Sequence, residues 1–173
     1  NPKSKEVFGF RILDFVWHLT LGFWISLNRI LKRVQDDVPV GGGLGKRPFA
    51  KLLRPLHEIE GLESIWFLTS NPWDFPDDLI VALALPKIEK YLHLPVQSGD
   101  DEVLKKMNRP YTVAEYKGLV RKIRKRIPEI RLGTDLIVGF PEETEEQFQH
   151  TVDLVKEIGF TGAYIAVYSE RPG

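Results

Sequence analysis

Polar side chains that could bind a small molecule follow four apolar runs of this chain. The loops at 69–74, 95–100, 139–144 and 168–173 are rich in amides, hydroxyls, carboxylates and turn-forming residues. Loops that follow the strands of a parallel sheet converge at one edge of that sheet. The sequence therefore predicts a site for a polar small molecule at this edge. Loops in this position are polar in most proteins, so a purely structural role stays equally open.

Other residue types exclude several kinds of chemistry. The chain has no cysteine, which excludes disulfides, thiolate zinc sites, cysteine nucleophiles and cysteine-ligated iron–sulfur clusters. His93 alternates with leucines in an apolar run and has no second metal ligand at useful spacing, so we expect a packed or hydrogen-bonded interior histidine. The acidic residues at 142–146 precede a helix, where carboxylates favour the macrodipole. We therefore predict no metal site and assign no catalytic acid or base.

Charge and hydropathy give no bulk argument for a nucleic-acid or membrane partner. Twenty-four basic residues balance 24 acidic ones, whereas phosphate binding usually needs a basic excess or a basic face. The basic run 121–126 lies on the polar side of an expected helix, which favours a solvated face over an RNA contact. The segment 12–31 carries polar and charged residues among its apolar ones, so we expect no membrane span. A chain without cysteines or an evident signal peptide fits the cytoplasm.

Helices that would support the loops are marked by their caps and apolar spacing. Thr112 with Glu115, and Thr144 with Gln147, have the spacing of capping boxes. Gly159 is placed to end the second of these helices. Further helices are expected at 49–59, with a kink at its internal proline, and at 77–85. The apolar faces of the two capped helices are predicted as Val113, Tyr116, Val120, Ile123 and Ile127, and as Phe148, Val152, Val155 and Ile158.

Short apolar runs starting near residues 65, 91, 131 and 163 alternate with these helices. Such alternation predicts an α/β fold with parallel strands and helices packed outside the sheet. The runs are apolar on nearly every residue, as expected for strands buried on both faces. A βα barrel, or part of one, is favoured, with a flavodoxin-like open sheet as the alternative. Residues 1–45 form an aromatic-rich segment that ends in a glycine-rich stretch, and residues 46–173 form the expected domain.

Four motifs give residues 49–173 a specific resemblance. They occur in the same order and at the same spacing as in the radical-SAM methylthiotransferases: 92–99 (LHLPVQSG), 107–112 (MNRPYT), 134–141 (TDLIVGFP) and 168–173 (YSERPG). The segment 70–75 (SNPWDF) has the form typical of the MiaB branch. The chain therefore closely resembles the central part of this family's barrel.

The resemblance implies a fold, cofactors and a partner. The fold would be a partial radical-SAM (βα) barrel whose N-terminal portion is missing or replaced. Members of the family bind S-adenosylmethionine on a [4Fe-4S] cluster held by a CxxxCxxC loop, form a deoxyadenosyl radical, and use a second cluster to deliver sulfur. MiaB-type enzymes place a methylthio group on N6-isopentenyladenosine in the tRNA anticodon loop. The RimO branch, the alternative, modifies an aspartate of a ribosomal protein.

Five residues carry over as cofactor contacts on the strength of that resemblance. Gln97 and Ser98 would approach the methionine or ribose part of S-adenosylmethionine. Asp135, Ile137 and Gly139 would flank its adenine, and the glycine would permit close approach of the backbone. Apolar strand edges suit a purine, and amide and hydroxyl groups suit the sugar and the amino acid.

The chain also departs from the family pattern. Glu142 stands where the family usually has glycine, Glu170 stands where it has proline, and residues 1–40 show neither the first strand nor the cysteine loop. A truncated gene or a shifted reading frame would produce such a sequence. We therefore expect a methylthiotransferase fragment that is inactive alone, or else a non-catalytic remnant or binding module. An unrelated βα enzyme is disfavoured by the ordered motifs. A half barrel would leave strand edges uncovered, so we also expect self-association.

Overall fold

A computed structural model describes residues 48–66, 68 and 70–170, and the chain divides into two compact units after Leu62. The predicted N-terminal segment 1–45 lies outside the described residues. In the first unit, helix α2 (Pro48–His57) contains Pro55, and Leu53 on this helix is fully buried. The helix predicted for residues 49–59 is therefore present.

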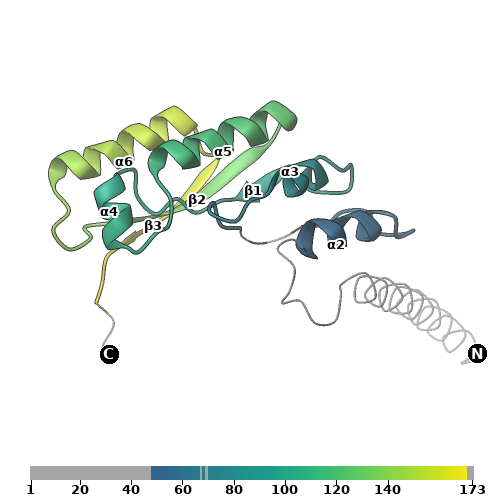
Figure 1. The fold of residues 1–173 in the computed structure, drawn as a ribbon, viewed down its shortest axis with the longest axis horizontal. Coiled ribbons are helices and arrows are strands. Elements are labelled where there is room, and N and C mark those ends of the chain that lie inside the picture. Colours follow the sequence, from purple (N-terminus) through teal and green to yellow (C-terminus); the bar gives the residue numbers. More distant parts are fainter. Residues whose placement is uncertain (1–47, 67, 69, 171–173) are drawn as a thin grey trace, which may run out of the picture. The chain divides into compact units, whose positions relative to one another are not determined.

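The second unit is an alternating α/β structure (Figure 1). In chain order its elements are α3 (Asp77–Leu83), β1 (Tyr91–His93), α4 (Asp101–Lys106), α5 (Val113–Arg126), β2 (Arg131–Val138), α6 (Glu145–Ile158) and β3 (Gly162–Val167). The three strands are parallel and lie in the order β1-β2-β3. Successive strands are thus neighbours joined by helical crossovers, as in a section of a βα barrel.

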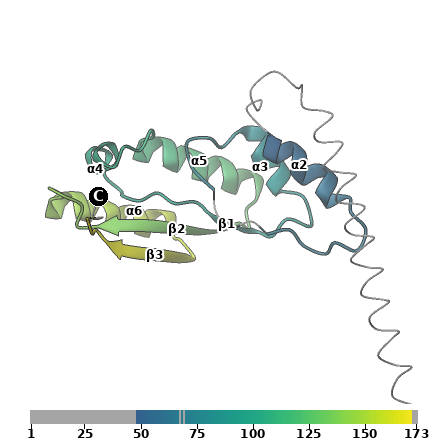
Figure 2. The same ribbon diagram turned by 90° about the horizontal axis from the view of Figure 1, so that it is seen from below.

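Helices α5 and α6 cover one face of this sheet, as two views at right angles show (Figures 1 and 2). Alternate residues of β2 point toward these helices and are buried: Leu132, Thr134 and Leu136. On the other face Gly133 is buried, whereas Asp135 and Ile137 are only half-buried. The α/β class with parallel strands is confirmed, and one face of the sheet is left open by the described helices of this unit.

Strand β3 differs from the prediction that every strand is buried on both sides. All six of its residues are exposed, including Tyr164, Ile165 and Val167, whose exposed fractions are 74%, 66% and 76%. The prediction was wrong for this strand because β3 is the edge of the described sheet. Apolar residues allow a strand to be buried, but the strand becomes buried only where other elements pack against it.

The strand expected near residue 65 is not formed as a regular strand by the described residues. Ile65 makes an isolated parallel bridge with Ile88, and Ser70 N donates to His93 O at 3.0 Å. Both contacts lie along the chain before and within β1, but their registers differ by one residue, so the path of a strand is kept without a continuous ladder. The physical reason is lack of burial, since Trp66 is 64% and Leu68 is 93% exposed.

The two predicted capping boxes are confirmed. Thr112 Oγ1 accepts from Glu115 N at 3.2 Å, and Glu115 Oε2 accepts from Thr112 N at 2.8 Å. Thr144 and Gln147 make the same reciprocal pair at the start of α6, with distances of 3.3 and 3.0 Å. Gly159 ends α6 in the left-handed conformation, with φ of 62°.

The buried faces of the two long helices were predicted with unequal success. Of the five residues predicted for the first helix, Tyr116, Val120, Ile123 and Ile127 are buried and Val113 is half-buried. Helix α6 buries Thr151, Leu154 and Ile158. Three residues assigned to its core face are only half-buried: Phe148, Val152 and Val155. The buried face of α6 is rotated slightly from the predicted one, because Thr151, a polar residue that the prediction left out, belongs to it.

Candidate functional site

Gln97 continues the line of β1 beyond its last residue and joins it to β2. Gln97 N donates to Asp135 O, and Ile137 N donates to Gln97 O, both at 2.9 Å. The backbone of Gln97 is left-handed, with φ of 70°, a conformation uncommon outside glycine that must be held by its surroundings. Three of the five predicted cofactor residues are therefore brought together by a pair of backbone hydrogen bonds.

Ser98 lies on the other side of this turn, under helix α6. Its side chain is fully buried, and its Oγ lies 3.3 Å from Thr151 Oγ1 and accepts from Asp100 N at 3.2 Å. Gly99 N also donates to Thr151 Oγ1, at 2.8 Å. The hydroxyl of Ser98 thus fastens the turn to α6 and does not face the open side of the sheet. Thr151 was missed by the sequence reasoning, although a lone threonine on an apolar helix face was a usable signal.

Two buried tyrosines and a threonine hold the chain on either side of the turn. Tyr116 Oη donates to Leu94 O at 2.8 Å, and Tyr111 Oη donates to Val96 O at 3.1 Å. Thr134 Oγ1 accepts from Val96 N at 3.0 Å. Burial raises the pKa of Tyr111 and strongly raises the pKa of Tyr116, so both remain neutral hydrogen-bond donors at physiological pH.

Asp135 presents its carboxylate on the open face of the sheet. The side chain is 39% exposed, and its Oδ1 lies 2.9 Å from Nε2 of His93, which is only 8% exposed. The ring of Tyr164 meets the His93 ring edge-on, at a centroid distance of 5.8 Å. His93 is therefore the hydrogen-bonded interior histidine that the sequence predicted, and it holds the Asp135 side chain in place.

Gly139 and Glu143 shape the loop after β2. Gly139 has φ of 68°, and an added Cβ would meet nothing closer than Val167 Cγ1 at 4.0 Å. Glu143 Oε2 accepts from Gly139 N at 2.6 Å and from Phe140 N at 3.2 Å, which closes the loop. Glu142 has φ of 64°, so glutamate occupies a conformation that favours the glycine of the family pattern. Lys106 Nζ, 2.9 Å away, lowers the pKa of the Glu142 carboxyl.

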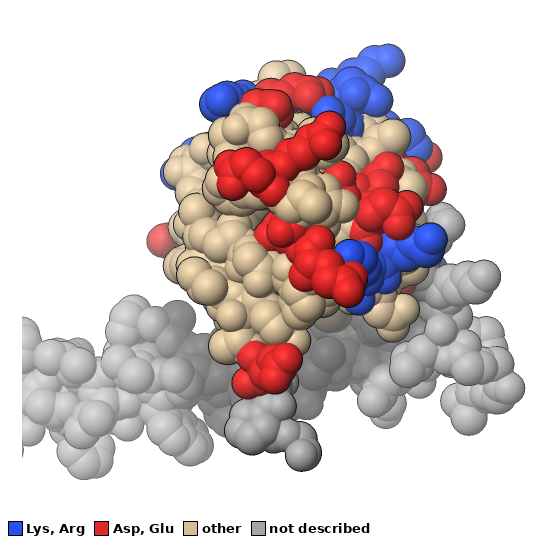
Figure 3. Space-filling model, turned by 90° about the vertical axis from the view of Figure 1, so that its left-hand side faces the viewer, with Lys and Arg blue, Asp and Glu red and all other residues tan. Residues whose placement is uncertain are grey.

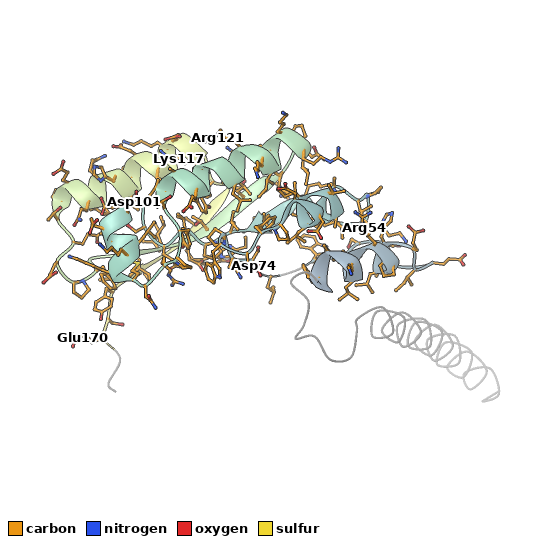
Figure 4. The ribbon with its side chains drawn as sticks, in the orientation of Figure 1. Arg54, Asp74, Asp101, Lys117, Arg121 and Glu170 are labelled. Atoms are coloured by element: carbon orange, nitrogen blue, oxygen red, sulfur yellow. The ribbon has the colours of Figure 1, made fainter. Side chains whose placement is uncertain are left out.

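The end of the sheet at which the strands finish carries more acidic than basic side chains (Figure 3). The acidic residues on the loops and helix starts at this end include Asp100, Asp101, Glu142, Glu145 and Glu146. Their negative field disfavours phosphate groups and favours cations. Lys117 and Arg121 lie instead along α5, on the other side of the ribbon from Asp74 (Figure 4). Two lysines of α5 pair with surface carboxylates, Lys117 with Glu157 at 2.6 Å and Lys122 with Asp77 at 3.4 Å.

The residues present do not fit a metal centre. Within the described ranges, no three His, Cys, Asp or Glu side chains are grouped so that they could hold a metal ion. The whole sequence contains no cysteine, so nothing in it can ligate an iron–sulfur cluster through thiolates. Within the same described ranges, none of the helices has both the length and the apolar character needed to cross a membrane.

Comparisons with known proteins agree with this geometry. Residues 29–155 match the model of the radical SAM superfamily. Curated proteins named tRNA-2-methylthio-N(6)-dimethylallyladenosine synthase are similar to the chain: 52% identical over 125 residues in Thermotoga petrophila and 50% over 126 in Neisseria meningitidis, in each case 72% of this chain. The chain spans only 28% of the length of these two relatives.

A solved structure shows the same fold. Coproporphyrinogen III oxidase (HemN) from Escherichia coli, a radical SAM enzyme, superposes with a TM-score of 0.60 at 24% identity, over 75% of this chain and 30% of that one. The expected partial barrel is confirmed, and so is the resemblance to the MiaB-type methylthiotransferases.

Proposed function

Because this chain belongs to the radical SAM superfamily, we propose that it forms the central part of the S-adenosylmethionine-binding barrel of a tRNA methylthiotransferase acting on dimethylallyladenosine. The observation that carries this proposal is the identity of 50–52% to synthases of that name over 72% of the chain. The remainder of the enzyme would come from segments that these 173 residues do not include. The tRNA substrate and a cytoplasmic location belong to the same proposal.

The cofactor would lie against the open face of the sheet, at the end of β1 and β2. The Asp135 carboxylate, oriented by His93, is an acceptor for hydroxyl or amino groups. The half-buried side chain of Ile137 offers an apolar surface to a purine, and the space beside Gly139 leaves room for close approach. Gln97 adds an amide on the same turn. Ser98 would act indirectly, by fixing the turn to Thr151.

The charge of this end of the sheet fits the same cofactor. S-adenosylmethionine carries a sulfonium and an ammonium group, and acidic side chains predominate here (Figure 3). In this family the cofactor supplies the radical that activates an unreactive carbon–hydrogen bond. We propose that this chain alone binds the cofactor without cleaving it, because it has no thiolate to hold the cluster.

Isothermal titration calorimetry of the full chain with S-adenosylmethionine tests the proposal. We expect saturable binding, tighter than that of S-adenosylhomocysteine, which lacks the sulfonium charge. Asp135→Asn should weaken binding about tenfold, the equivalent of one charge-assisted hydrogen bond. Gln149→Ala is a matched control, because Gln149 is exposed on α6 and its side-chain amide donates to Asp153 Oδ1 on the same helix at 2.9 Å.

Two outcomes would contradict the proposal. The first is no heat of binding from a folded wild-type chain. The second is equal affinity of the wild type and the Asp135→Asn variant. Release of deoxyadenosine by the anaerobically reconstituted chain would instead refute the statement that it cannot cleave the cofactor.

A further inference from the structure

An exposed tryptophan stacks on a buried tyrosine beside the Gln97 turn. The rings of Trp73 and Tyr111 are nearly parallel, with an interplanar angle of 8° and a centroid distance of 5.9 Å. Trp73 is 49% exposed, whereas Tyr111 is 7% exposed. One face of the indole therefore rests on the interior and much of the remaining surface meets solvent. We propose that Trp73 is a stacking site for an unpaired nucleobase of RNA, an inference that rests on the proposed tRNA function.

The stack is built rigidly, as a binding platform must be. Tyr111 is held by burial and by the hydrogen bond from its Oη to Val96 O, the residue before Gln97. The loop that carries Trp73 is held at Ser70 N, which donates to His93 O, and at Asp74 N, which donates to Asn71 Oδ1 at 3.0 Å. The indole is thus ordered before any ligand arrives, so little conformational entropy is lost on stacking.

The position of the stack connects it with the candidate cofactor site. Tyr111 bonds the carbonyl of Val96, and Gln97, next in the chain, is the residue that bridges β1 and β2. Asp74, the neighbour of Trp73, lies on the side of the ribbon opposite Lys117 and Arg121 of α5 (Figure 4). A base on Trp73 would therefore lie close to the turn and away from the basic side chains of α5.

The surrounding charge favours stacking over contact with phosphate. Asp74 and Asp77, which follow Trp73 in the chain, are exposed, and their negative charges would repel the RNA backbone. A nucleobase is uncharged and every base has a π-face, so an aromatic ring can hold it without ion pairing. The positive charge of Arg109 lies near Tyr111, where it partly offsets the rise in the pKa of Tyr111 that burial causes. One positive charge therefore lies beside the Trp73–Tyr111 stack. An exposed aromatic ring is thus the means by which an acidic surface can hold an unpaired RNA loop.

The test uses the full chain and a synthetic 17-nucleotide RNA hairpin with a seven-nucleotide loop, measured by fluorescence anisotropy. We expect Trp73→Ala to weaken binding about tenfold, within the range found for the loss of one base–aromatic stack. Trp73→Phe keeps a ring and should restore most of the affinity. Trp66→Ala is the matched control, since Trp66 is also exposed and its Nε1 donates to the nearby Ser64 Oγ at 3.1 Å. A fully paired RNA of equal length should show no effect of Trp73→Ala.

A second readout excludes a merely structural role for the indole. In protein labelled with 5-fluorotryptophan, the ¹⁹F resonance of Trp73 should shift on addition of the hairpin, whereas that of Trp66 should not. Hairpin binding that is unchanged by Trp73→Ala would overturn the stacking proposal and leave the proposed function standing. A wild-type chain that binds S-adenosylmethionine but no hairpin would overturn the stacking site while the cofactor-binding part of the proposed function survived.

Discussion

Gly99 is the position at which the smallest change should most disturb the candidate site. A Cβ added there would lie 2.5 Å from Thr151 Cα, 2.6 Å from His150 O and 2.8 Å from His150 C. These are backbone atoms of α6, so no side-chain rotation can relieve the contacts. Gly99→Ala must therefore push α6 away from the turn, and with it Thr151, which accepts from Gly99 N at 2.8 Å.

The expected loss of stability has two parts. Forcing a methyl group into a packed interior costs about 1–3 kcal/mol. Weakening the buried hydrogen bond to Thr151 adds about 1 kcal/mol. A total of about 3 kcal/mol is a large part of the roughly 5–15 kcal/mol that stabilises a domain. It corresponds to a melting temperature about 12 °C lower, taking about 4 °C per kcal/mol for a unit of this size.

Thermal and urea unfolding followed by circular dichroism would measure this loss. Gly118→Ala is the matched control, because a Cβ there meets only Arg121 Nη2 at 3.9 Å on the surface of α5. Alanine is favoured over glycine inside a helix by about 1 kcal/mol, so this variant should melt higher than the wild type. Equal melting temperatures for Gly99→Ala and the wild type would refute the account of how the turn is held.

Two further substitutions test the loops beside the turn. Burial alone would raise the pKa of Asp100, but hydrogen bonds from His150 and from the N–H groups of Val103 and Glu102 outweigh it and lower the pKa below its usual 3.8. The stabilisation from this carboxylate is therefore present above pH 3.8 and is lost as the pH falls through the lower pKa of the folded state. The free energy of urea unfolding of Asp100→Asn should thus depend less on pH below about 4 than that of the wild type. The same pH dependence in both proteins would contradict this. Residue 142 has a left-handed backbone, so Glu142→Gly should melt higher than the wild type because backbone strain is relieved. Glu142→Ala should melt lower, because it keeps the strain and loses the ion pair with Lys106. A glycine variant no more stable than the alanine variant would refute the role of strain.

The features that could be predicted from the sequence are those set by neighbours along the chain. Both capping boxes and the end of α6 at Gly159 depend on residues within one helical turn, and all are present. The strand near residue 65 depended on partners far away in the chain. Its apolar residues suited a strand, but Trp66 and Leu68 stay largely exposed. Local propensity therefore indicated a strand where long-range packing did not support one.

The candidate site shows the same division. Motif matching brought Gln97, Asp135 and Ile137 to attention, and the structure joins them through two backbone hydrogen bonds. The motifs could not show that Ser98 turns toward α6, because this depends on Thr151, more than fifty residues later in the chain. The pairing of His93 with Asp135 was equally invisible, since it follows from the register of β1 and β2.

Strand β3 has a consequence for how barrels of this kind can be assembled. Its exposed apolar side chains point to both faces of the sheet, Ile165 and Val167 to one and Tyr164 to the other, and one of its two edges is already paired with β2. A strand that covered the other edge would be held by backbone hydrogen bonds, and its side chains would have to match the exposed apolar residues on both faces of β3.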